Sequence, residues 1–148
     1  MKEYRGKKVE EKFLILMGIW LFLCSFQDIR RKEIHIMLLF VGIVMAFIGV
    51  FQVNGTIENR ILGVTLGGIL LGMNVITRGQ IGVADGIIVG ILGITLGFYT
   101  CSGILLMALF VSAIVSLILI ILKKAKRKTT IPFVPFLLLG YLGVLVLT

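Results

Sequence analysis

The sequence predicts an all-α, polytopic integral membrane protein with about six transmembrane helices. Of its 148 residues, 59% are hydrophobic and 15% are charged, and the mean hydropathy of +1.13 excludes packing as one water-soluble globule. Charged residues divide the chain into uncharged runs, several of them close to the ~20 residues that a helix needs to cross a bilayer. These runs are too numerous for a cleavable signal peptide. Because lipid offers no partners to backbone groups, each crossing is predicted to be helical.

Five uncharged runs define the predicted helices. They span residues 13–27, 34–53, 61–77, 86–122 and 132–148. The first run is short but gains length from its polar flanks, and the fourth is too long for one crossing. We therefore divide the fourth run into two helices, with the turn at residues 99–103, where Tyr, Thr, Cys, Ser and Gly follow one another.

The segments between these runs are short and leave no room for a soluble domain. We predict one membrane-embedded domain over residues 1–148, in which residues 1–12 form a basic amino-terminal tail. Asp28 follows the first predicted crossing and Asp85 follows the third, so both lie on the same face of the membrane. The segment before Pro132 follows the fifth crossing and joins them there.

Basic residues predict the orientation of the chain. Nine lysines and arginines lie on the face of the two aspartates and six on the opposite face. The nine are Arg30, Arg31, Lys32, Arg78, Lys123, Lys124, Lys126, Arg127 and Lys128. The six are Lys2, Arg5, Lys7, Lys8, Lys12 and Arg60. Because cytoplasmic segments carry the excess of lysine and arginine, we predict an inner or plasma membrane protein whose aspartates face the cytoplasm.

The formal net charge of +8 does not predict a nucleic-acid partner, because the basic residues flank apolar runs and lack interleaved aromatic residues. Anionic lipid headgroups are the predicted partners of these charges. Cys24 and Cys101 lack the CxxC spacing of a metal site and are interpreted as buried, small hydrophobic residues. We predict no metal and no cofactor. The oligomeric state stays open.

Asp28 and Asp85 are the only aspartates of the chain. An ionisable residue at a membrane segment costs about 2.5–3.5 kcal/mol on insertion scales, which favours a functional role. Two carboxyl groups brought together in a poorly solvated place cannot both ionise easily, so one keeps its proton and the pair can act as acid and base. This predicts an aspartic protease. The alternative is a small proton- or cation-coupled transporter or channel subunit, in which the same carboxyl groups bind the passing ion.

Three segments carry motifs in a specific order. Residues 28–34 read Asp-Ile-Arg-Arg-Lys-Glu-Ile, residues 82–85 read Gly-Val-Ala-Asp, and residues 131–140 contain the only two prolines of the chain, Pro132 and Pro135. The segments resemble, in turn, the D-x-R-x-x-x-I-P, G-x-G-D and L-P-F-G-P-F-L-A-L-G segments of type IV prepilin peptidases. The third is the most specific, because two prolines and two phenylalanines at this spacing are rare by chance.

The resemblance implies a membrane aspartic endopeptidase that removes the leader from type IV prepilin-like, membrane-anchored precursors at the cytoplasmic membrane face. Asp28 and Asp85 would be its catalytic pair, acting on a water without a metal. The residues expected to shape the site or contact substrate are Gly82, Ala84, Gly86, Pro132 and Pro135. The resemblance does not say whether the precursor serves a type IV pilus, protein secretion or DNA uptake. We expect a peptidase-only form, without the methyltransferase domain of many members.

The chain departs from the family pattern at three positions. Ala84 stands where the aspartate motif has its second glycine. If that position requires a positive φ, alanine costs roughly 1 kcal/mol or more and displaces Asp85, whereas a position that only needs a small side chain accommodates it. His35 replaces a proline, and Ile87 replaces a lysine common in bacterial members. An inactive relative that binds pilin-like helices without cutting them is therefore a further alternative.

Glycine pairs four residues apart predict close helix contacts. Two pairs lie in the third predicted crossing and two in the fourth: Gly63 with Gly67, Gly68 with Gly72, Gly86 with Gly90, and Gly93 with Gly97.

Overall fold

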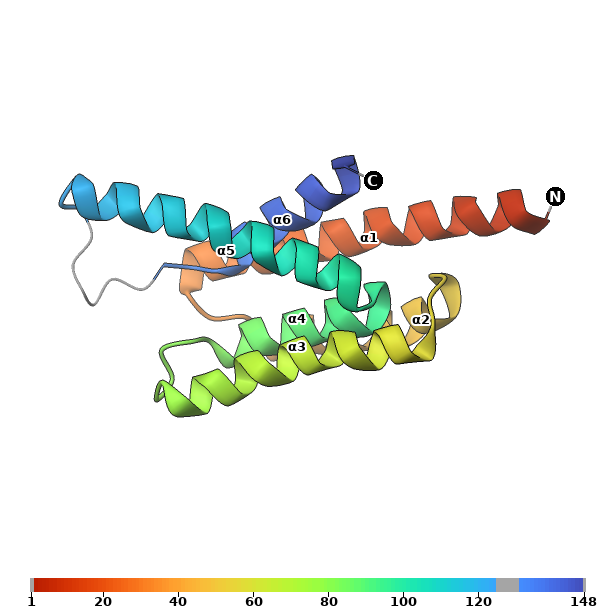
Figure 1. Cartoon of the computed structure of the whole chain (residues 1–148), viewed down its shortest axis with the longest axis horizontal. Coiled ribbons are helices and arrows are strands. Elements are labelled where there is room, and N and C mark those ends of the chain that lie inside the picture. Colours follow the sequence, from red (N-terminus) through yellow and green to blue (C-terminus); the bar gives the residue numbers. More distant parts are fainter. Residues whose placement is uncertain (1, 125–130, 148) are drawn as a thin grey trace.

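A computed structural model describes residues 2–124 and 131–147 of the chain. In these residues it contains six helices and no strand (Figure 1), which confirms the predicted all-α class. The helices are α1 (Lys2–Arg31), α2 (Ile36–Gln52), α3 (Ile57–Ile76), α4 (Val83–Leu96), α5 (Phe98–Ile121) and α6 (Val134–Leu147). Several basic side chains counted above lie outside the part described to the side-chain level: Lys2, Arg5, Lys126, Arg127 and Lys128.

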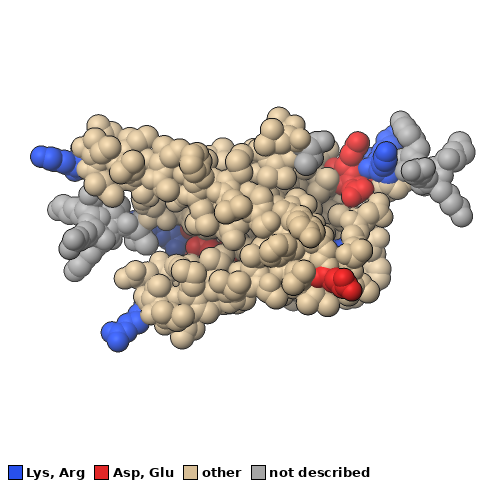
Figure 2. Space-filling model, in the orientation of Figure 1, with Lys and Arg blue, Asp and Glu red and all other residues tan. Residues whose placement is uncertain are grey.

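The helices have the composition of membrane-embedded elements. Within the described residues, three segments are long and apolar enough to cross a membrane: Gly6–Arg31, Ile57–Ile76 and Phe98–Ile121. Helices α2, α4 and α6 are also apolar but shorter, with 17, 14 and 14 residues. On the face drawn in Figure 2, charged side chains gather toward the two ends of the molecule and an uncharged belt lies between them. The chain is therefore a multi-pass membrane protein.

Helix boundaries differ from the prediction at two places. Helix α1 begins at Lys2, so the segment predicted as an amino-terminal tail is continuous with the first crossing. The long uncharged run is divided at Gly97, and residues 99–103 belong to α5, so the predicted turn was wrong. Gly97 has a φ of 86°, which glycine adopts without the penalty of a Cβ. The side chain of Asn59 accepts a hydrogen bond of 2.9 Å from the Phe98 N–H and so caps α5.

Helices α3 and α4 pack backbone against backbone. A Cβ at Gly63 would collide with the Gly93 carbonyl, and one at Gly67 would lie 2.6 Å from the Gly90 Cα. Gly68 and Gly72, in contrast, have no other atoms within 4 Å of such a Cβ. Gly63 and Gly67 on α3 therefore pack against the backbone of α4, whereas Gly68 and Gly72 face outward.

Helix α4 is the centre of the bundle, since it contacts α2, α3 and α5, while α6 packs on α1 and α5. Half of its 14 residues are buried, among them Ile88, Val89 and Leu92, each at 0% exposure. The Tyr141 hydroxyl of α6 donates a 2.7 Å hydrogen bond to the Leu14 carbonyl of α1. This packing places the end of α1, the start of α4 and the start of α6 at the same end of the molecule (Figure 1).

Arg60, which the sequence analysis counted among the basic residues that set the orientation, is buried at 6% exposure. Its guanidinium donates hydrogen bonds to the carbonyls of Ile94 at 2.9 Å, Thr95 at 3.2 Å, and Val53. These carbonyls lie at the carboxyl-terminal ends of α4 and α2, where helices leave acceptors unpaired. Arg60 therefore joins the two helix ends.

Basic residues follow the ends of α1, α3 and α5. Lys32, Arg78 and Lys123 have φ values of 55°, 55° and 53°. This left-handed conformation costs a residue other than glycine about 1–2 kcal/mol. Cations at helix carboxyl termini interact favourably with the helix dipole. Each of these helices thus ends in a tight turn that leaves a positive charge beside its last carbonyls.

We predict that Gly63→Leu lowers the free energy of unfolding by about 3 kcal/mol or more, because the new side chain forces α3 away from the Gly93 backbone. The matched substitution Gly72→Leu, on the outward face of the same helix, is expected to change it by less than ~0.5 kcal/mol. Thermal unfolding in detergent, followed by helical circular dichroism, measures the difference. Equal stability of the two variants would contradict the close contact of α3 and α4.

Candidate active site

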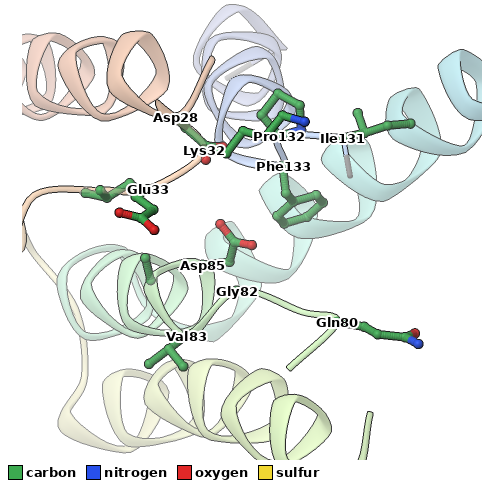
Figure 3. A pocket seen from close by; sticks show the side chains of 12 residues that line it. Asp28, Lys32, Glu33, Gln80, Gly82, Val83, Asp85, Ile131, Pro132 and Phe133 are labelled. Atoms are coloured by element: carbon green, nitrogen blue, oxygen red, sulfur yellow. The ribbon is translucent and has the colours of Figure 1, made fainter. Parts of the chain in front are cut away.

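One cavity collects residues from all three motif segments, and we call it the aspartate cavity (Figure 3). Its volume is about 360 Å³. It is lined by Asp28, Lys32, Glu33, Ile34, Gln80, Gly82, Val83, Ala84, Asp85, Ile131, Pro132 and Phe133. The two aspartates, predicted to lie on the same face, therefore line the same cavity, and the segment before α6 forms its third side.

Asp28 lies in the last turn of α1 and is 8% exposed. Its Oδ2 accepts a hydrogen bond of 3.1 Å from the backbone N–H of Val134, the first residue of α6. The first amides of a helix have no partner within the helix, and a carboxylate is a favourable acceptor for them. Pro135 has no N–H to satisfy, and the next amide, of Phe136, bonds to the Phe133 carbonyl. The Phe133 amide also donates to the Asp28 carboxylate. Asp28 thus accepts hydrogen bonds from two successive amides at the start of α6.

Asp85 lies in the first turn of α4, three residues after Gly82, which is the N-cap. Its carboxylate turns back and accepts a hydrogen bond from the Gly82 N–H, the arrangement of an acidic side chain in a capping box. A Cβ at Gly82 would lie 2.9 Å from Asp85 Oδ2. The backbone of Gly82, with φ −64° and ψ 134°, suits any residue. Gly82 therefore leaves room for the Asp85 carboxylate in this position, and its backbone conformation does not itself call for glycine.

The structure brings three of the five predicted site-shaping residues to the cavity. Ala84 is helical, and the positive φ values of non-glycine residues in the described chain occur at other positions, so alanine fits without strain. Gly86 does not line the cavity, because it packs against α3, where a Cβ would lie 2.8 Å from Leu71. Pro132 lines the cavity, whereas Pro135 lies inside the first turn of α6.

The two carboxyl groups approach each other from opposite walls of the cavity. In Figure 3, Asp85 points from α4 toward the end of α1, where Asp28 lies, and the two are close enough for a Coulombic interaction. Among the described residues, no group of three or more His, Cys, Asp or Glu side chains forms a metal site. Two facing carboxyl groups beside an open volume can hold a water and exchange protons with it.

Glu33 was not among the predicted site residues; it is exposed and lines the cavity together with Lys32 and Gln80. Its position five residues after Asp28, inside the first motif segment, was the available signal. The left-handed turn at Lys32 ends α1 and lets the chain fold along the cavity. Cys24 and Cys101 are buried and unpaired, as predicted, and neither lines the cavity.

Comparison with known proteins gives one match. A sequence model of the type IV leader peptidase family matches residues 15–121, a range that includes both aspartates and Gly82. Comparison with curated proteins and with solved structures gives no match.

We predict that Asp28→Leu speeds hydrogen exchange of the Val134 amide at least ~10-fold, because the substitution removes the only side-chain acceptor that this amide has in the structure. Asp28→Asn keeps an acceptor oxygen and is expected to stay within about threefold of the parent chain. Hydrogen exchange with mass spectrometry of peptides that contain Val134 measures both. Unchanged exchange in Asp28→Leu would mean that this hydrogen bond does not hold the start of α6.

Proposed function

Since the chain belongs to the type IV leader peptidase family, we propose that it is an aspartic endopeptidase that removes the leader from type IV prepilin-like precursors. The observation that carries the proposal is that Asp28 and Asp85 line the same cavity although they are 57 positions apart in the chain. Acid–base hydrolysis by two carboxyl groups needs this convergence.

In the proposed mechanism, the two aspartates share one proton and bind the attacking water between them. The ionised carboxylate accepts a proton from the water, and the protonated carboxyl group donates its proton to the scissile carbonyl oxygen. The carbon–nitrogen bond then breaks as a proton passes to the leaving amine. The two carboxyl groups titrate as a pair, so either can begin as the acid.

The non-helical segment before α6 supplies backbone groups at the same place. Ile131 and Pro132 line the cavity outside any helix. Non-helical backbone within a membrane protein is tolerated where it lines a cavity formed by the protein. A peptide bond must leave helical conformation before a water can attack it, and an extended neighbour can pair with such a segment. We assign to residues 131–133 the role of pairing with the extended segment of the precursor around the scissile bond.

The positions of the two aspartates along their helices favour a peptidase over a transporter. A transporter is expected to hold its carboxylates near the middle of the membrane. Asp28 lies in the last turn of α1 and Asp85 in the first turn of α4. Lys32 and Arg78 lie at the same end, and this positive charge supports a cytoplasmic location of the site in the inner or plasma membrane.

We predict that Asp28→Asn and Asp85→Asn each reduce leader removal by at least ~10²-fold, because either change removes one partner of the acid–base pair. Co-expression with a prepilin-like precursor reports cleavage as a shift in electrophoretic mobility. Glu58→Gln, which removes an exposed carboxylate in the first turn of α3, is the matched control and should cleave normally. Substantial cleavage by either aspartate variant, at normal membrane insertion, would exclude the two-carboxyl mechanism.

We predict that Gly82→Val reduces cleavage by about tenfold or more, because its Cβ would displace the Asp85 carboxylate from a contact that leaves only 2.9 Å. Gly68→Val, at an outward-facing glycine of α3, controls for the general effect of a branched residue. The rate of precursor cleavage at equal enzyme levels is the measurement. If Gly82→Val were as active as Gly68→Val, the position of Asp85 would not depend on this glycine.

A further inference from the structure

A second hollow lies between α2 and α3, with α4 as its floor, and we call it the apolar groove. Its volume is about 320 Å³, and every residue that lines it is apolar. The wall residues used below are Phe47 on α2 and Val64 on α3, and the floor includes Ile87, Gly90 and Ile94 on α4. A surface without any charged or hydrogen-bonding side chain fits an occupant that is itself apolar.

Gly90 makes the floor deeper than the packing of the chain requires. Cβ atoms at its neighbours Gly86 and Gly93 would collide with α3, but one at Gly90 would meet nothing nearer than the Gly67 Cα at 4.0 Å. The absence of a side chain at Gly90 therefore has no cause in the contact between α3 and α4. Small residues on a helix surface permit the close approach of another helix.

The apolar groove continues from the aspartate cavity along α4. Val83 and Ala84 line the cavity, and Ile87, one turn further along the same face, lines the groove. Ile87 to Ile94 extends roughly 10 Å along the helix axis at 1.5 Å per residue. A chain that is cut at the aspartates and continues as a helix into the membrane reaches the groove directly.

We propose that the apolar groove binds the first turns of the precursor's apolar helix, the part that follows the scissile bond. This inference rests on the proposed function, and it assigns substrate recognition to α2, α3 and α4. The occupant must be helical, because a peptide in the bilayer has to satisfy its own backbone groups. Its side chains must be uncharged at the groove, and small residues on its inner face allow close contact with Gly90.

The first test compares Gly90→Leu with Gly68→Leu. The probe is a designed precursor with a short basic leader, a glycine and an apolar helix of about 20 residues. Leucine at Gly90 fills the floor of the groove, and we expect cleavage to fall at least ~10-fold through a higher KM. Gly68→Leu adds the same side chain to the outward face of α3 and should leave cleavage unchanged. Equal cleavage by the two variants at equal stability would overturn the proposal.

A second test does not depend on the folding of Gly90→Leu. A photoreactive phenylalanine analogue replaces Phe47, which lines the groove at 71% exposure, or Leu106 on α5, which lies outside it at 67% exposure. Both are made in the Asp85→Asn background, so that the precursor stays uncut. We expect cross-linking of the precursor from position 47 and not from position 106.

The outcomes separate the groove from the proposed function. If the parent chain cleaves the precursor but cross-linking is equal at the two positions or absent at 47, the groove proposal is wrong and the peptidase stands. If position 47 cross-links only to a second copy of the chain, the groove is an interface between copies, which also overturns the proposal. If the parent chain cleaves no precursor, the proposed function fails and the groove proposal falls with it.

Discussion

The hydrogen bond from the Val134 amide to Asp28 is the interaction on which the site depends, because it joins parts of the chain that are 106 residues apart. It holds the carboxylate in the last turn of α1 against the start of α6. The same contact fixes the non-helical segment that forms one wall of the aspartate cavity. Packing of α6 on α1, with the Tyr141 hydroxyl bonded to the Leu14 carbonyl, keeps the two helices at the spacing that this bond needs.

Asp85 is positioned by a different constraint, the contact of α4 with its neighbours. The backbone contact at Gly93 and Gly63 sets the distance between α4 and α3. Arg60 binds carbonyls at the carboxyl-terminal end of α4 and joins it to the end of α2. Since α4 is held along its length, its first turn can present the Asp85 carboxylate in a fixed direction. The cavity is thus built on two rigid helix ends, which suits acid–base chemistry that tolerates little misplacement.

The sequence predicts the fold class, because each apolar run can be recognised from its own residues. It also places both aspartates on one face, because the number of runs between them is even. It does not predict the break at Gly97, since the cap of α5 comes from Asn59, 39 residues earlier. The polar residues 99–103 resembled a turn, yet the Ser102 hydroxyl bonds to the Tyr99 carbonyl inside the helix. The burial of Arg60 and the place of Glu33 in the cavity likewise depend on contacts between distant segments. Local patterns carry no information about such partners.

The roles of the two small residues before Asp85 follow from their different environments. Gly82 has an ordinary extended backbone, and its lack of a side chain leaves room for the carboxylate that returns to its amide. Ala84 is one residue before Asp85 in the helix, where a Cβ meets no conformational penalty. A glycine at position 84 would only add freedom to the unfolded chain and weaken the first turn of α4. The alanine therefore supports a firmly placed Asp85, and the departure from the G-x-G-D motif gives no structural reason to regard this chain as inactive.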